Sequence, residues 1–198
     1  MKILNTLVIL LFSSFIYAQD GLIPLEELEN EQLFKSMEEA LLEPENVVRL
    51  DLSKQKIPNL DYDFRKLVKI QWLKLAKNDF KKFPIAVTEL PLLQWLDLSK
   101  NDIDKIPDEI GKLQYLRSLN MSKNKIYVIS PELGKLKKLE TIDLWDNPIK
   151  TFPIELRGMS SLKLLDLRVT VINDTEKKKL QKMFPYTKIK FSKTCNCK

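Results

Sequence analysis

The chain has 198 residues, of which 44% are hydrophobic and 30% charged, and its net charge is +6. This length suits roughly one domain, and only 4 glycines exclude a collagen-like or low-complexity chain. The sequence contains no histidine, which excludes Ser-His-Asp and Cys-His catalysis and most zinc sites.

The first predicted element is a signal peptide over residues 1–18. Lys2 gives a short positive start, residues 3–16 are largely apolar, and Ala18 ends a small-residue cleavage site. A membrane anchor is the alternative, but polar residues interrupt a stretch already shorter than the ~20 residues that a membrane span needs. No second apolar stretch of that length follows. We therefore expect a mature chain without a membrane span, secreted or held in the cell envelope, periplasmic or extracellular.

Residues 19–46 form a predicted N-terminal cap. Their apolar residues recur at roughly helical spacing, which favours two short helices that meet near Asn30, and Pro44 would end the second helix. The segment holds nine acidic side chains and one basic side chain.

Residues 47–172 repeat one pattern six times with a period of 23 residues. Apolar residues fill the most regular column, which consists of Leu50, Leu73, Leu96, Leu119, Ile142 and Leu165. Further apolar columns stand three residues before it and two and seven residues after it. Alternation with period two predicts a short strand with one buried face in each unit. Because one such unit cannot bury its apolar side alone, the units are expected to stack.

An asparagine column lies between the apolar columns, at Asn78, Asn101, Asn124 and Asn147. We expect these amides to bond backbone groups at the bend after each strand. The second half of each unit has apolar residues three apart, as in Val87 and Leu90, which suits a helical turn. Pro84, Pro107 and Pro153 recur just before this turn, where a helix starts.

The six segments VVRLDLSKQKI, IQWLKLAKNDF, LQWLDLSKNDI, LRSLNMSKNKI, LETIDLWDNPI and LKLLDLRVTVI resemble the leucine-rich-repeat pattern L-x-x-L-x-L-x-x-N-x-L. The stretches FPIAVTEL, IPDEIGKL, SPELGKL and FPIELRGM are similar to the second half of the 23-residue subtype. The chain thus resembles small exported bacterial members of the leucine-rich-repeat family. The resemblance implies an α/β solenoid with a curved parallel sheet and short helices or turns on its convex side.

Residues 173–198 form a predicted C-terminal cap and tail. Residues 173–176, Asn-Asp-Thr-Glu, favour a helix start, Pro185 would stop that helix, and residues 187–192 could add one closing strand. Cys195 and Cys197 follow in the tail. Three states are open to them: a local disulfide, links to other chains, or free thiols. The cap and tail hold eight basic and two acidic side chains. Oppositely charged ends, or the tail cysteines, would allow a homo-oligomer; solvated cap helices explain the charges equally well.

The resemblance implies that residues between the buried leucines face outward on the concave side of the sheet. All three tryptophans fall there, and Trp72 and Trp95 occupy one column in neighbouring rungs, about 4.8 Å apart, so that their rings can stack. Tryptophan is frequent among residues that dominate interfaces; alternatively, the indoles only cover the sheet together with lysine stems. The candidate binding residues are Arg49, Trp72, Lys74, Lys77, Trp95, Asp97, Lys100, Asn120, Asp143 and Trp145.

These residues favour a non-catalytic secreted module that binds a protein partner through its concave face. The alternatives are a structural or self-assembling cell-surface component and a carbohydrate-binding adhesin. Four lysines recur at one position of the repeat, at Lys54, Lys77, Lys100 and Lys123. They are either simply exposed or attract an anionic partner. The adjacent aspartate column would partly neutralise their field, which argues against a nucleic acid partner. Because carboxylates on an open, solvated sheet rarely acquire raised pKa values, we expect no enzyme activity. We also expect no cofactor and no metal.

Overall fold

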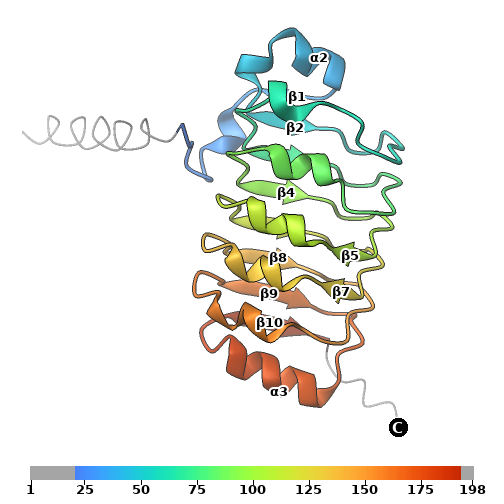
Figure 1. Ribbon diagram of the computed structural model, residues 1–198, viewed down its shortest axis with the longest axis vertical. Helices are drawn as coiled ribbons and strands as arrows, with labels where there is room; N and C mark the ends of the chain where they lie inside the picture. Colours follow the sequence, from blue (N-terminus) through green and yellow to red (C-terminus); the bar gives the residue numbers. More distant parts are fainter. Residues whose placement is uncertain (1–20, 193–198) are drawn as a thin grey trace, which may run out of the picture.

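The computed structural model describes residues 21–192. The predicted signal peptide at 1–18 and the two cysteines Cys195 and Cys197 lie outside the described residues. Eight strands form one parallel sheet in the order β1-β2-β3-β4-β6-β8-β9-β10 (Figure 1). These strands are β1 (Leu33–Phe34), β2 (Arg49–Asp51), β3 (Trp72–Lys74), β4 (Trp95–Asp97), β6 (Ser118–Asn120), β8 (Thr141–Asp143), β9 (Leu164–Leu167) and β10 (Lys188–Phe191).

Short 3₁₀ helices stack along the other side of the molecule, in front of the sheet in Figure 1. They are η3 (Phe64–Lys66), η4 (Ile85–Glu89), η5 (Asp108–Lys112), η6 (Pro131–Lys135) and η7 (Ile154–Gly158). Beside them, β5 (Lys105–Ile106) and β7 (Val128–Ile129) pair as a small second sheet. In each of these turns the first of the two apolar columns is buried, as Val87 is in η4, and the second follows directly after the helix, as Leu90 does. As predicted, Pro84, Pro107 and Pro153 immediately precede η4, η5 and η7.

The apolar columns meet between the sheet and the helices. Strand register places Leu50 against Leu73, Leu96, Leu119, Ile142 and Leu165 in turn. Each of these side chains is at most 3% exposed. The predicted stacking of 23-residue units into one continuous core is confirmed.

The asparagine column forms the predicted bonds at the bend. Asn101 Nδ2 donates to the carbonyl oxygens of Leu75 at 3.1 Å and Leu98 at 2.9 Å, which joins two neighbouring rungs. Its Oδ1 accepts from the backbone N–H groups of Asn78 at 3.1 Å and Phe80 at 3.3 Å. The other three asparagines make equivalent bonds. Each amide is buried and fully used in holding the rungs together.

The N-terminal end differs from the predicted pair of helices. Here η1 (Leu28–Asn30) is followed by the strand β1, then by α2 (Met37–Leu42) and η2 (Pro44–Asn46). The prediction of two short helices that meet near Asn30 is therefore wrong over β1, which pairs Leu33 with Arg49 on β2. A long uncovered edge strand leaves a row of backbone groups unpaired, and here β1, of only 2 residues, covers β2 and forms the edge of the sheet.

Two glutamines, Gln71 and Gln94, hold the segment before η1 in place by hydrogen bonds. This contact was not predicted from the sequence. Gln71 Oε1 accepts from the Ile23 N–H at 2.8 Å, and Gln71 Nε2 donates to the Gly21 carbonyl at 2.8 Å. Gln94 Nε2 donates to the Ile23 carbonyl at 2.7 Å. Both glutamines are almost fully buried, so this segment is part of the folded end of the solenoid.

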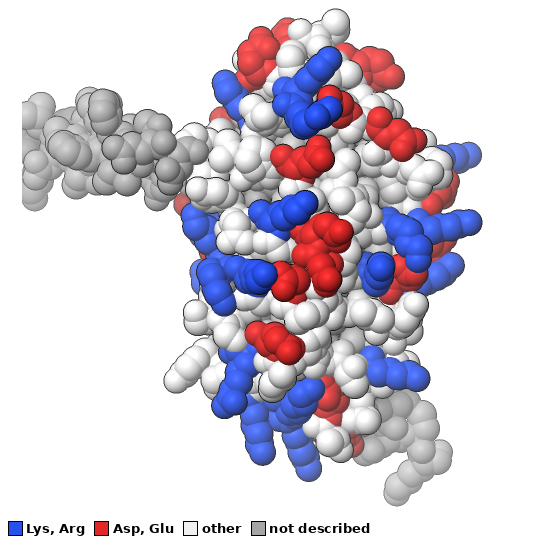
Figure 2. All heavy atoms as spheres, viewed as in Figure 1, with Lys and Arg blue, Asp and Glu red and all other residues white. Residues whose placement is uncertain are grey.

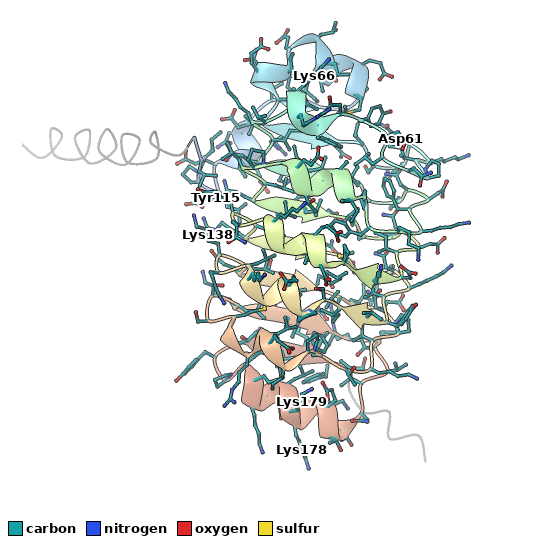
Figure 3. The ribbon with its side chains drawn as sticks, in the orientation of Figure 1. Asp61, Lys66, Tyr115, Lys138, Lys178 and Lys179 are labelled. Carbon is teal, nitrogen blue, oxygen red and sulfur yellow. The ribbon has the colours of Figure 1, made fainter. Side chains whose placement is uncertain are left out.

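The C-terminal end follows the prediction. Asn173 caps α3 (Asp174–Met183) by accepting from the Glu176 N–H, and β10 adds a last parallel strand to β9. Glu176 is 8% exposed and joins α3 to the preceding rung, because its Oε1 accepts from the Phe152 N–H at 2.9 Å. Lys179 supports this joint by donating to the Phe152 carbonyl, whereas its neighbour Lys178 is exposed (Figure 3).

Charge differs between the two ends of the solenoid. Several acidic side chains lie around α2, with some basic ones among them, whereas basic side chains gather over α3 (Figure 2). Among residues 21–192, no helix combines the length and the apolar character that a membrane crossing needs.

Candidate functional site

The first outward column of the sheet runs from Arg49 through Trp72, Trp95, Ser118 and Thr141 to Leu164, one residue on each strand. The two indole rings stack face to face, with 4.4 Å between ring centroids and 2° between ring planes. The Arg49 guanidinium lies 5.0 Å from the Trp72 ring centroid. Because Arg49 and Trp95 flank Trp72 in the register, both faces of Trp72 are covered. The open indole face is that of Trp95, on the side of Ser118.

A shallow slot adjoins this open face. Two hollows of about 300 Å³ and 250 Å³ share the side chains of Trp95, Ser118 and Thr141, and Leu164 lines the second hollow. Ser118 and Thr141 are small, and the Thr141 hydroxyl donates to the Ser118 hydroxyl at 2.8 Å. We name the space bounded by Trp95, Ser118, Thr141 and Leu164 the concave slot. It spans three strand spacings, ~14 Å.

An ion-pair chain forms one rim of the concave slot, at the start of the strands. Arg117 Nε donates to Glu140 Oε1 at 2.9 Å, and Lys163 Nζ donates to Glu140 Oε2 at 2.5 Å. The hydrogen bond from Lys163, together with Arg117, holds the pKa of Glu140 below its ordinary value. The hollow of about 300 Å³, which Arg117 and Glu140 line, is also lined by Leu25 and Glu29 from the segment around η1.

The second outward column forms the other rim, at the end of the strands. It consists of Asp51, Lys74, Asp97, Asn120, Asp143 and Asp166. Asp97, Asn120 and Asp143 each accept the backbone N–H two residues on, at 2.8, 3.0 and 2.9 Å. Sequence reasoning missed this role, although an Asp or Asn at five of six positions was a signal for it.

The charges of this column are balanced at its ends but not in the middle. Asp51 pairs with Lys74 at 3.6 Å, and Asp166 pairs with Arg168 at 2.7 Å and with Lys190 at 3.5 Å. Within residues 21–192, neither Asp97 nor Asp143 has a Lys or Arg nitrogen within 4.0 Å. Burial, and next the nearby Asp166 carboxylate, raise the pKa of Asp143 above its ordinary value, so the expectation that this column is too well solvated for raised pKa values is wrong at Asp143.

Trp145, Lys77 and Lys100 lie apart from the concave slot. They were expected on the strands with the other candidates, but they follow the strand ends, on the bend. Lys77 and Lys100 have positive φ angles of 58° and are exposed. The pKa of Lys77 is lowered by Lys100 and then by Lys54, because the lysines of successive rungs lie close together. Lys123 Nζ lies 4.5 Å from the Trp145 ring centroid, so one face of this indole is covered.

The described part of the chain holds no cluster of three or more potential metal ligands. The concave slot is open and joins an aromatic face, two hydroxyls and carboxylates. This arrangement can bind a polar or cationic group by stacking and hydrogen bonding.

Comparisons with known proteins agree with this architecture. A leucine-rich-repeat protein of Leptospira interrogans has 31% sequence identity and a TM-score of 0.65, over 86% of this chain and 40% of that one. Internalin C2 of Listeria monocytogenes has 22% identity and a TM-score of 0.61, over 74% of this chain and 62% of that one. The chain thus spans less than two thirds of either protein. No curated protein matches it by sequence. The family model described as a leucine-rich repeat region matches residues 45–191, and the chain therefore belongs to the leucine-rich-repeat family.

Proposed function

We propose that this protein is a non-catalytic, exported binding module that holds a protein partner on its concave face. The observation that carries the proposal is the Trp72–Trp95 stack, which leaves one indole face open beside the concave slot. Tryptophan is enriched among residues that contribute ~2 kcal/mol or more to an interface. An exposed aromatic face bordered by polar residues is typical of such a contact.

The shape of the face favours a macromolecular partner. Its hollows are shallow, whereas small-molecule sites usually enclose most of their ligand. Solenoids of stacked repeats offer an extended curved surface instead. Export rests on the signal peptide predicted at residues 1–18, and the division into N-terminal cap, six repeats and C-terminal cap is part of the same proposal.

The proposal is tested by capture of partners on the immobilised chain. Wild type and the single variants Trp95→Ala and Trp145→Ala are each incubated with extracellular and envelope proteins. Circular dichroism and thermal unfolding check that each variant is folded. We expect a protein that binds wild type and Trp145→Ala but is lost with Trp95→Ala, because only Trp95 borders the concave slot. Equal capture by a folded Trp95→Ala variant would contradict the proposal.

Self-association through the ends is a second candidate function. It is favoured by the acidic side chains around α2 and the basic side chains over α3 (Figure 2). Light scattering at low and high salt tests it, since end-to-end contacts between opposite charges weaken as salt screens them. A monomer at every salt concentration would exclude this role.

A further inference from the structure

The carboxylate of Asp143 borders the same hollow as the open face of Trp95. This hollow of about 250 Å³ is lined by both side chains, by Ser118, Thr141 and Leu164, and also by Asp166 and Lys190. The nearest cations, Arg168 and Lys190, both pair with Asp166 on the next strand. The pKa of Asp143 is raised by burial and by Asp166, although Arg168 and Lys190 lower it. Within residues 21–192, the Asp143 carboxylate has no ion-pair partner within 4.0 Å, and Arg168 and Lys190 compensate its charge only in part.

The negative charge is not needed to build the bend. Asp143 accepts the Trp145 N–H, but Asn120 accepts the Ser122 N–H in the same way without a charge. Asp143 is half-buried, and partial removal of its carboxylate from water opposes folding, so an asparagine would suit the bend better at position 143. Asp97, two strands from Asp143 on the same rim, is 7% exposed and also has no cation within 4.0 Å in the described chain.

The indole supplies the second element of a cation site. Trp95 offers one free face, and Arg49 on the covered face of Trp72 shows that this stack already accepts a guanidinium at 5.0 Å. A planar cation stacked on Trp95 would repeat that arrangement at the other end of the aromatic pair. Its charged head would lie toward the carboxylate of Asp143.

We propose that the concave slot receives a basic side chain, arginine in the first place, from the protein partner. This inference rests on the proposed function and names the chemistry of its central contact. The aliphatic part of the side chain packs between Trp95 and Leu164, over the hydroxyls of Ser118 and Thr141. The guanidinium stacks on the indole and donates to Asp143. A neutral sugar would also stack on Trp95, but it would form no ion pair with Asp143.

Short peptides test the charge directly. The full chain is titrated with the capped pentapeptide Gly-Ser-Arg-Ser-Gly and with the same peptide carrying citrulline, which keeps the shape of arginine but is neutral. Methyl β-glucoside is the third probe. The readout is the indole N–H resonance of Trp95, assigned with a Trp95→Phe variant. At low ionic strength we expect the arginine peptide to bind about fivefold more tightly than the citrulline peptide.

Two matched variants locate the effect. Asp143→Asn keeps the bond to the Trp145 N–H and should reduce binding of the arginine peptide to the citrulline level. Asp51→Asn keeps the equivalent bond to the Ser53 N–H, removes a carboxylate paired with Lys74 and should leave the preference unchanged. The preference should also fade as pH falls through the pKa of Asp143, because the protonated carboxyl no longer attracts a cation.

Each contrary result has a distinct meaning. Equal binding of the arginine and citrulline peptides, an unchanged preference in Asp143→Asn, or tighter binding of the glucoside would overturn the inference. If Trp95→Ala nevertheless loses the captured partner, the binding module stands and only the chemistry of the contact is wrong. If Trp95→Ala keeps that partner, the proposed function itself fails.

Discussion

The asparagine column and the first outward column run along the same rungs and obey opposite rules. Asn78, Asn101, Asn124 and Asn147 are buried and make nearly the same bonds in every copy. The outward column changes from Arg49 through two tryptophans to Ser118, Thr141 and Leu164. Every rung must form the same bend, so the same buried asparagine and the same hydrogen bonds recur. A partner contacts each rung differently, so residues that vary between rungs are where binding can be built.

The largest expected effect on stability separates two asparagines of one rung. Asn124→Ala should lower the free energy of unfolding by about 3 kcal/mol, because it leaves the buried backbone of Leu98, Met121 and Ile103 without its partners. Asn120→Ala, on the outward face, should cost less than about 1 kcal/mol. Urea unfolding measures both. Equal losses would show that the two faces do not differ in structural importance.

Close approach between rungs on the convex side gives the next effect. A Cβ at Gly134 would lie 2.8 Å from the Glu155 carbonyl oxygen, whereas at Gly158 its nearest neighbour is Lys137 Nζ at 3.6 Å. Gly134→Ala should therefore destabilise the chain by about 2 kcal/mol. Gly158→Ala should change stability by less than about 0.5 kcal/mol, since the Lys137 side chain can move. A Gly134→Ala variant as stable as wild type would show that η6 and η7 can move apart.

The bend column contains a residue that suits its position poorly. Val169 has a φ of 56° where four earlier rungs carry Lys with similar angles. The left-handed region is costly for a β-branched side chain. Val169→Asn should therefore raise the free energy of unfolding by about 1 kcal/mol, and the melting temperature should rise with it. Val171 is equally exposed but has no positive φ, and Val171→Asn should bring no gain.

The smallest predicted effect separates two aspartates of one rim by their pH dependence. The pKa of Asp143 is raised, so its ionised form is the less favourable one in the fold, and Asp143→Asn should stabilise the chain at neutral pH. Burial alone would raise the pKa of Asp166, but the bonds from Arg168 hold it below its ordinary value. Asp166→Asn should therefore destabilise the chain at neutral pH.

Unfolding across a pH series measures both aspartate effects. The first difference should shrink as pH falls through the raised pKa of Asp143 and be gone below the ordinary aspartate pKa. The second should shrink from that ordinary value down through the lowered pKa of Asp166. Changes of the same sign for both variants would contradict the charge assignment of the rim.

The period of 23 residues was enough to predict the sheet, the register and the stacking of Trp72 on Trp95, because residues one period apart become neighbours. It did not predict that Arg49 covers one indole face or that Asp143 forms no ion pair within residues 21–192. These depend on side-chain conformations that no spacing specifies. The strand β1 and the bonds from Gln71 and Gln94 were also missed. Those bonds reach 50 and 71 residues along the chain to a segment outside the repeat.

The register of the sheet also means that the concave slot can change size only in steps. Trp95 and Leu164 stand on β4 and β9, with two rungs between them. Deleting one unit of 23 residues would shorten this distance by one strand spacing, ~4.8 Å, and leave every column in phase. Duplication of a unit would widen it by the same step. Related solenoids could thus fit partners of different bulk by gaining or losing whole rungs, without redesign of their interior.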